Sequence, residues 1–163
     1  MPVAIKKVRF AALAIVSACA LALPAMSSGQ STDPFAGTWK LDAAKSTYKP
    51  GPGSKSSTLT IEPAGKGMKA SIDSVTADGP LKWTYTAMPD GKDVPVTGNP
   101  NAEMASMTLP GPNERVVVFK RGGKPVMTSK AVVAKDGKTM TITQDGTNPK
   151  GEAVHNVLHY VKQ

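Results

Sequence analysis

The stretch that decides the fold is Phe35-Ala36-Gly37-Thr38-Trp39-Lys40-Leu41. It places a Gly-x-Trp motif at the start of a predicted strand over residues 37–41. The residues that follow show no sustained helical period, and Gly, Pro, Asp and Asn interrupt them at short intervals. The sequence therefore predicts one antiparallel β-domain, residues 35–163, that closes against this first strand.

Short segments of alternating apolar and polar residues support this prediction. The clearest is 81–87, where Leu81, Trp83, Tyr85 and Ala87 share one face of a strand. Further predicted strands are 57–62, 68–75, 94–97, 102–109, 115–120, 126–134, 139–144 and 154–162. The connections are too short for the crossovers of a parallel sheet. We therefore expect an all-β fold, a single up-and-down barrel of eight to ten strands that leaves no open edge.

Four local features complete the predicted fold. Residues 42–46 are compatible with one helical turn capped by Asp42. Residues 48–56 are rich in Pro, Gly and Ser and are expected to form a loop. The segment 115–120 is apolar on both faces, which suggests a strand between two layers. Met104 is expected to be buried in its strand.

The first 25 residues have the order of a secretory signal peptide. Lys6, Lys7 and Arg9 precede an apolar run over 10–23, and cleavage is expected after the small residue Ala25. The run is shorter than the ~20 residues that a membrane-spanning helix needs. Residues 26–34 then form a polar, flexible lead. The predicted location is periplasmic or secreted.

A second processing route remains open at Cys19. Val16-Ser17-Ala18-Cys19 resembles a lipobox, in which the cysteine would be lipidated and become the N-terminus of a membrane-anchored protein. Against this, the chain stays apolar beyond Cys19, as an uninterrupted signal peptide would. Cys19 is the only cysteine, so cleavage after Ala25 leaves a mature chain without disulfides.

Charge indicates little about partners. Removal of residues 1–25 leaves 17 basic and 12 acidic residues, a formal charge of +5 spread over turns and strand edges. Only Phe119-Lys120-Arg121 combines an aromatic with basic residues as a nucleic-acid-binding strand would. We therefore expect no nucleic-acid partner, and contact with a membrane only through a lipid on Cys19. The sequence leaves the oligomeric state open.

The motif in the opening stretch resembles the first motif of lipocalins and other calycin barrels. Three segments, 35–46, 90–98 and 135–141, resemble in this order a group of small exported bacterial proteins described as lipocalin-like. The resemblance implies that Trp39, introduced by Gly37, plugs the closed end of the barrel. It also implies a basic side chain across the tryptophan. Lys162 is the candidate, with Arg115 and Arg121 as competitors.

The sequence contains no recognisable catalytic or metal-binding pattern. His155 and His159 share a strand face, but four residues of strand separate them by roughly 13 Å, too far to hold one metal together. We therefore expect no enzyme, no metal and no cofactor.

The inward-facing residues are the remaining candidates for function. An eight-stranded barrel is either filled by side chains or leaves room for one small ligand, and both alternatives remain open. In the first hypothesis the barrel binds a small hydrophobic ligand. In the second, a packed barrel acts as an interaction module of the cell envelope. The candidate ligand-binding residues are Trp83, Tyr85, Met107, Phe119, Met140, Leu158 and Tyr160. Met104 and Met127 are further residues expected to face inward.

Overall fold

The computed structural model describes residues 33–163, all of whose regular elements are strands. The predicted signal peptide, Cys19 and most of the polar lead lie outside the described residues. The strands are β1 (Gly37–Leu41), β2 (Thr47–Lys49), β3 (Ser56–Ala64), β4 (Gly67–Thr76), β5 (Gly79–Ala87), β6 (Val94–Thr97), β7 (Met104–Gly111), β8 (Glu114–Arg121), β9 (Lys124–Val133), β10 (Thr139–Thr147) and β11 (Ala153–Lys162). No helix within residues 33–163 is long and apolar enough to cross a membrane.

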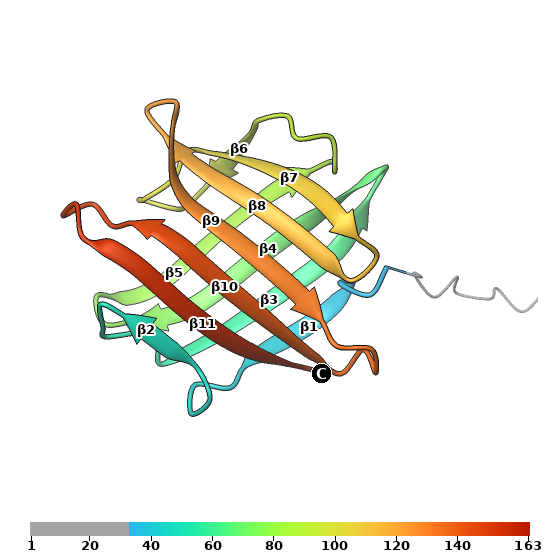
Figure 1. Ribbon diagram of the computed structural model, residues 1–163, viewed down its shortest axis with the longest axis horizontal. Coiled ribbons are helices and arrows are strands. Elements are labelled where there is room, and N and C mark those ends of the chain that lie inside the picture. The colour runs from blue at the N-terminus through green and yellow to red at the C-terminus, as the bar shows by residue number, and fades with distance from the viewer. Residues whose placement is uncertain (1–32) are drawn as a thin grey trace, which may run out of the picture. The chain divides into compact units, whose positions relative to one another are not determined.

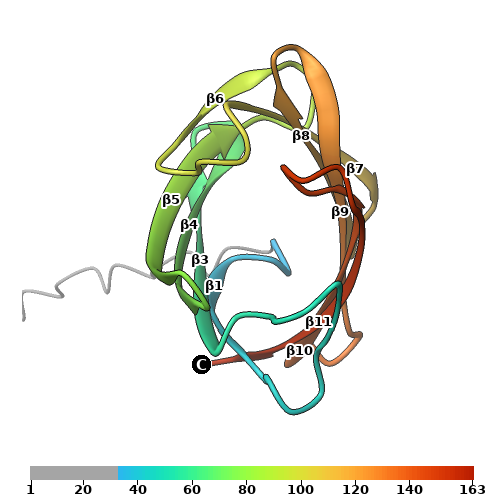
Figure 2. The same cartoon turned by 90° about the vertical axis from the view of Figure 1, so that its left-hand side faces the viewer.

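The strands form a closed antiparallel barrel. Each strand from β3 to β11 pairs with its neighbour in sequence, and β1 pairs with both β3 and β11. Strands β1 and β2 both pair with β11, β1 near its end and β2 nearer its start. The two short strands therefore lie one after the other along β11 and count as one strand of the barrel wall. The result is a ten-strand barrel, within the predicted range of eight to ten strands. Figure 1 shows its twisted wall from the side, and Figure 2 shows the sheet curving round to close.

Alternation of side chains explains why these sequences form the wall. On β8, Arg115, Val117 and Phe119 are buried inside the barrel, whereas Val116 and Val118 are half-buried on the outside. The expectation that this apolar segment lies between two layers is therefore wrong. It is one strand of a single wall, and its outward valines are shielded only in part.

Three further local expectations need correction. Residues 48–56 were expected to form a loop, but Tyr48 and Lys49 belong to β2, which pairs with β11 over three residues. Residues 42–46 form a hydrogen-bonded turn and no helix, although Asp42 accepts from the turn as expected: Lys45 N–H donates to its carbonyl (3.3 Å) and its carboxylate (3.3 Å). Met104 lies half-buried on the outer face of β7, because Ala105 and Met107 take the inward positions.

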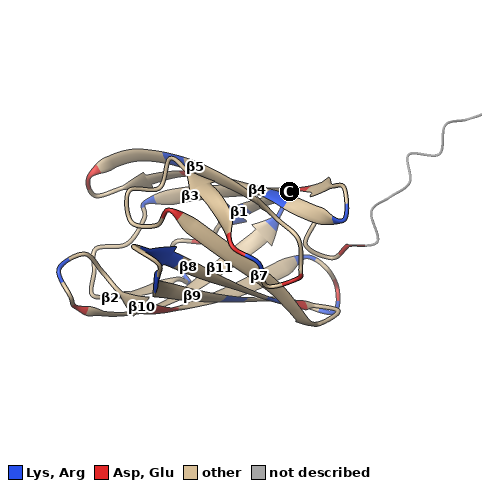
Figure 3. Ribbon diagram, turned by 90° about the horizontal axis from the view of Figure 1, so that it is seen from above, with Lys and Arg blue, Asp and Glu red and all other residues tan. Residues whose placement is uncertain are grey.

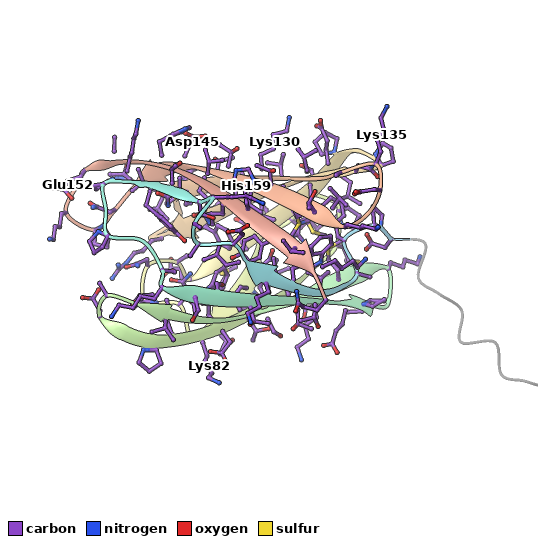
Figure 4. All side chains as sticks on the ribbon, turned by 90° about the horizontal axis from the view of Figure 1, so that it is seen from below. Lys82, Lys130, Lys135, Asp145, Glu152 and His159 are labelled. Carbon is purple, nitrogen blue, oxygen red and sulfur yellow. The ribbon has the colours of Figure 1, made fainter. Side chains whose placement is uncertain are left out.

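Charged side chains cover the outside of the barrel. Lys, Arg, Asp and Glu are distributed together over the strands and turns (Figure 3). Lys82, Lys130 and Asp145 point away from the interior (Figure 4). Pairs such as Lys82–Asp73 (2.6 Å) are exposed to solvent, so each contributes at most ~1 kcal/mol to stability.

Candidate functional site

One end of the barrel is closed by the tryptophan of the opening motif. Trp39 is fully buried, and its indole N–H donates to the Phe35 carbonyl at 2.8 Å. The Lys162 ammonium lies 5.0 Å from the centre of the Trp39 ring. Gly37 has φ of +124°, and a Cβ there would come within 2.9 Å of the Lys162 side chain. A glycine at this position therefore lets the lysine of the last strand cross the first one.

The same end contains the packed core of the molecule. The largest fully buried side chains lie beside the turns of this end or in the segment that enters it. They are Trp39, Phe35, Ile61, Met107, Met140 and Val133. No comparable set occurs at the opposite end within residues 33–163, so the interior is divided between a filled part and an open part.

Arg115 is a buried charge at the boundary of the packed core. It is 3% exposed, its guanidinium lies 5.0 Å from the centre of the Phe35 ring, and one amino group approaches the Met68 sulfur at 3.2 Å. Its Nε has no hydrogen-bond partner among residues 33–163, and no carboxylate in this range pairs with it. Arg115 thus contacts Phe35, whereas Lys162 contacts Trp39.

The other end of the barrel holds a cavity of about 340 Å³. Its walls come from the barrel strands, and its rim comes from the last residues of β4 and β8 and from the connections that follow β2, β6 and β10. The apolar lining consists of Leu59, Ile72, Leu81, Trp83, Ala102, Val117, Phe119, Val126, Met127, Ile142, Pro149 and Leu158. A cavity of this size and composition is typical of small-molecule sites.

Three aromatic rings form one cluster in the wall of the cavity. Trp83 stacks on Tyr85, with ring centres 6.0 Å apart, and Phe119 meets both rings edge-on at 5.4 and 5.8 Å. Trp83 and Tyr85 share the inward face of β5, and Phe119 comes from β8. Tyr85 and Phe119 are buried, whereas Trp83 is only partly covered and presents ring surface to the cavity.

Hydroxyl groups add polarity inside the cavity. Tyr160 donates to the Ser57 hydroxyl at 3.1 Å, and burial raises the pKa of Tyr160 to about 12. Burial also raises the pKa of Tyr85, with the nearby Arg115 charge acting in the opposite direction. Within residues 33–163, the Tyr85 and Ser129 side chains make no hydrogen bond. Their hydroxyls are therefore available to a molecule in the cavity.

The structure brings together most of the residues that the sequence singled out. Trp83, Tyr85, Phe119, Leu158 and Tyr160 line the cavity. Met127 does as well. Met107 and Met140 do not, since they lie in the packed core at the closed end. Alternation along a strand gives the inward face but not the depth at which each residue lies, so it could not separate the two groups.

The polar part of the lining was not foreseen from the sequence. It includes Tyr48, Ser54, Ser57, Ser74, Thr76, Asn99, Asn101, Arg121, Ser129, Gln144, Thr147, Asn148 and Asn156. Several belong to turns, where Asn and Ser are common for reasons of backbone geometry alone. The buried serines occupy inward positions of predicted strands. This pattern was the one signal in the sequence that could have indicated a polar part of the lining.

The two histidines lie outside this site. His155 is exposed and contacts the Asp145 carboxylate at 2.6 Å, whereas the half-buried His159 lies 3.4 Å from the Thr141 hydroxyl. No cluster of His, Cys, Asp or Glu within residues 33–163 has the arrangement of a metal site.

Comparison with known proteins identifies the fold and no sequence family. No protein-family model matches the chain. No curated protein matches it either. Among solved structures, a fatty acid binding protein of Schistosoma mansoni, in complex with arachidonic acid, is similar with a TM-score of 0.54 and 16% identity, over 82% of this chain and 99% of that chain.

Two other structures show weaker similarity. The zebrafish ileal bile acid-binding protein, complexed with cholic acid, has a TM-score of 0.48 and 11% identity over 80% of this chain and 99% of its own. The siderocalin Ex-FABP has a TM-score of 0.45 and 13% identity over 80% of this chain and 74% of its own. The Schistosoma structure confirms the predicted architecture, a closed antiparallel β-barrel.

Proposed function

We propose that this protein is a non-enzymatic binding protein that holds one small hydrophobic ligand inside its barrel. The observation that carries the proposal is the cavity of about 340 Å³ with Trp83, Tyr85 and Phe119 in its wall. It favours ligand binding over the alternative of a barrel filled by its own side chains. The similar Schistosoma protein was solved with a fatty acid bound, which supports the same class of ligand.

The proposed contacts follow from the lining. Trp83, Tyr85 and Phe119 would form the flat apolar surface, and Leu158 would complete it from β11. Tyr160 would offer its hydroxyl oxygen, because its proton is already given to Ser57. Gly37, Trp39 and Lys162 would act on stability only, since they lie at the closed end.

Tryptophan fluorescence tests this proposal directly. A bound apolar ligand would change the fluorescence emission of Trp83, whereas the emission of the fully buried Trp39 should change little. We expect a saturable change on titration with an apolar probe such as decanol, and its loss in Trp83→Phe. Native mass spectrometry of the protein purified from its own source should show a co-purified small molecule. A chain that binds no apolar probe and carries no molecule would contradict the proposal.

We also propose that the protein acts outside the cytoplasm. The proposal rests on residues 1–25, which have the pattern of a signal peptide. Mass spectrometry of the mature chain should place its N-terminus at Met26. An N-terminus at a lipid-modified Cys19 would instead show a membrane-anchored protein.

A further inference from the structure

The rim of the cavity differs in chemistry from its walls. Arg121 is the only charged side chain in the lining that residues 33–163 provide, and this lining contains no carboxylate. The arginine ends β8, next to the turn that joins β8 and β9, so it lies at the open end of the barrel. A molecule that fills the apolar walls would therefore place its outer end beside one positive charge.

The Arg121 guanidinium is not used by the protein itself. It forms no hydrogen bond or ion pair with any residue in 33–163. The adjacent Lys120 differs, since its ammonium pairs with the Asp93 carboxylate at 2.8 Å on the outer face. The nearby acid Glu103 is engaged with the turn, where its carboxylate accepts the Gly122 N–H at 2.7 Å.

Two carboxamides extend this part of the rim. Met104 pairs with Lys120, and Glu103 N–H donates to the Lys120 carbonyl at 3.0 Å, so the connection that carries Asn99 and Asn101 arrives beside the end of β8. The Asn99 oxygen accepts the Asn101 N–H at 2.9 Å, which leaves its amino group unpaired among residues 33–163. The Asn101 side chain is likewise unpaired within this range.

On the opposite side of the rim the carboxamides bond mainly with one another and with their own turns, although the Gln144 amino group is unpaired among residues 33–163. Asn148 bonds with Glu152 and with backbone groups of its own turn. Asn156 donates to Gln144 at 3.2 Å and accepts the Lys49 N–H at 3.2 Å. The side of the rim with Asn99, Asn101 and Arg121 therefore differs from the opposite side in carrying an unpaired cation.

We propose that the ligand is an amphipathic anion, bound with its apolar body against the aromatic cluster and its acidic head at the rim beside Arg121, Asn99 and Asn101. Donor groups and a cation without a counter-charge recognise a carboxylate or another oxyanion. This inference rests on the proposed function, to which it adds the class of the head group and its orientation.

Three probes with the same alkyl chain and different head groups test the inference. Decanoate, decanol and decyltrimethylammonium are titrated below their micelle concentrations, with Trp83 emission as the readout. We expect decanoate to bind about tenfold more tightly than decanol, because hydrogen bonds to a charged group are worth this much. Decyltrimethylammonium should bind most weakly.

Variants locate the acidic head. Arg121→Gln should abolish the preference for decanoate over decanol. Lys124→Gln is the matched control, because Lys124 faces Arg121 in the same turn but does not line the cavity. It should retain the preference for decanoate. Asn101→Asp, which adds a negative charge to the rim, should weaken decanoate binding selectively.

The outcomes separate this inference from the proposal on which it rests. Equal affinity for decanoate and decanol would overturn the inference while leaving an apolar binding site. A preference for decanoate that survives in Arg121→Gln but is lost in Arg115→Gln would overturn it too, by placing the head at the packed end. If none of the three probes binds, the proposed function itself is contradicted.

Discussion

Trp39 is the residue on which closure of the packed end depends. It is fully buried, bonded to the Phe35 carbonyl and covered by Lys162. We expect Trp39→Ala to lower the free energy of unfolding by about 3–5 kcal/mol, as truncation of a buried aromatic does. Urea denaturation measures this loss. Unchanged stability together with lost binding of an apolar probe would show that Trp39 contacts the ligand instead.

Lys162→Met separates the cation from the packing of its side chain. Methionine keeps much of the apolar stem across Trp39 but removes the ammonium group. The expected loss is about 0.5–2 kcal/mol, the range for a cation–π contact. Thermal unfolding of Lys162→Met and Trp39→Ala, measured side by side, compares the two losses of stability. A loss in Lys162→Met as large as that in Trp39→Ala would contradict the role assigned to the lysine.

Arg115 presents the opposite case, a buried charge whose removal should help. Its Nε has no partner among residues 33–163, and desolvation of such a cation is costly. We expect Arg115→Met, which has a similar shape, to raise the free energy of unfolding by about 1 kcal/mol or more. Denaturant unfolding at neutral pH tests this. A clear destabilisation would mean that the charge is compensated within the fold.

Tyr160 should make stability depend on alkaline pH. Burial raises its pKa from 10.0 to about 12 in the folded chain. Between these values the folded chain keeps a proton that the unfolded chain has lost, so the free energy of unfolding falls as the pH rises. The total decrease is about 2–3 kcal/mol. Tyr160→Phe should flatten the profile between pH 10 and 12, and an equally steep profile in this variant would assign the effect to other groups.

At the scale of elements, β6 has the shortest pairing with both of its neighbours. Only two residue pairs join it to β5 and two join it to β7. The chain leaves β6 at Gly98, where φ is +85° and a Cβ would come within 2.4 Å of the Lys82 carbonyl oxygen. This glycine therefore permits the close approach that positions Asn99 and Asn101 at the rim.

We expect Gly98→Ala to destabilise the protein by about 1–3 kcal/mol, because both φ and the available space exclude a side chain. Hydrogen exchange should quicken first in Val94–Thr97. Gly51→Ala is the control, since nothing lies within 4 Å of a Cβ at Gly51. Equal effects of the two substitutions would argue that Gly98 has no special role.

The accuracy of sequence-based prediction varied among elements for physical reasons. Period-two alternation identified β3 to β5 and β7 to β11, because one face of each is buried. Strand β2 was missed, since three residues followed by Pro50 and Gly51 carry no detectable period, and it is held by pairing with β11 and by Tyr48, which packs against the core. The apolar outer face of β8 suggested a second layer because valine favours strands whether or not it is covered.

At the scale of the whole molecule, alternation predicts a barrel but not a cavity. Met107 and Phe119 face inward alike, yet the first fills the packed end and the second lines the open end. Depth along the barrel depends on register and on which turns gather at each end, and these follow from pairing over the whole chain. The rim carboxamides were missed for the same reason, since Asn99 and Asn101 follow β6 whereas Gln144, Asn148 and Asn156 belong to a distant part of the sequence.

Closure of the barrel depends on the junction of β1 and β11, which joins residues near the two ends of the described chain. Trp39, Lys40 and Leu41 pair with Lys162, Val161 and Tyr160. Gln163 N–H donates to the Thr38 carbonyl at 2.9 Å, whereas Lys162 N–H faces β10 and donates to the Lys138 carbonyl. Because N–H directions alternate along a strand, the Val161 N–H faces β1.

Val161→Pro should therefore open this junction selectively. The Val161 side chain is 39% exposed on the outer face, so its replacement leaves the core and the cavity lining unchanged. Proline removes one closing hydrogen bond and places a ring against Lys40, at a cost of about 3 kcal/mol or more. Val161→Thr is the control and should change stability by at most ~0.5 kcal/mol. If both variants unfold at the same urea concentration, the stability of the barrel does not depend on this junction, and the prediction is wrong.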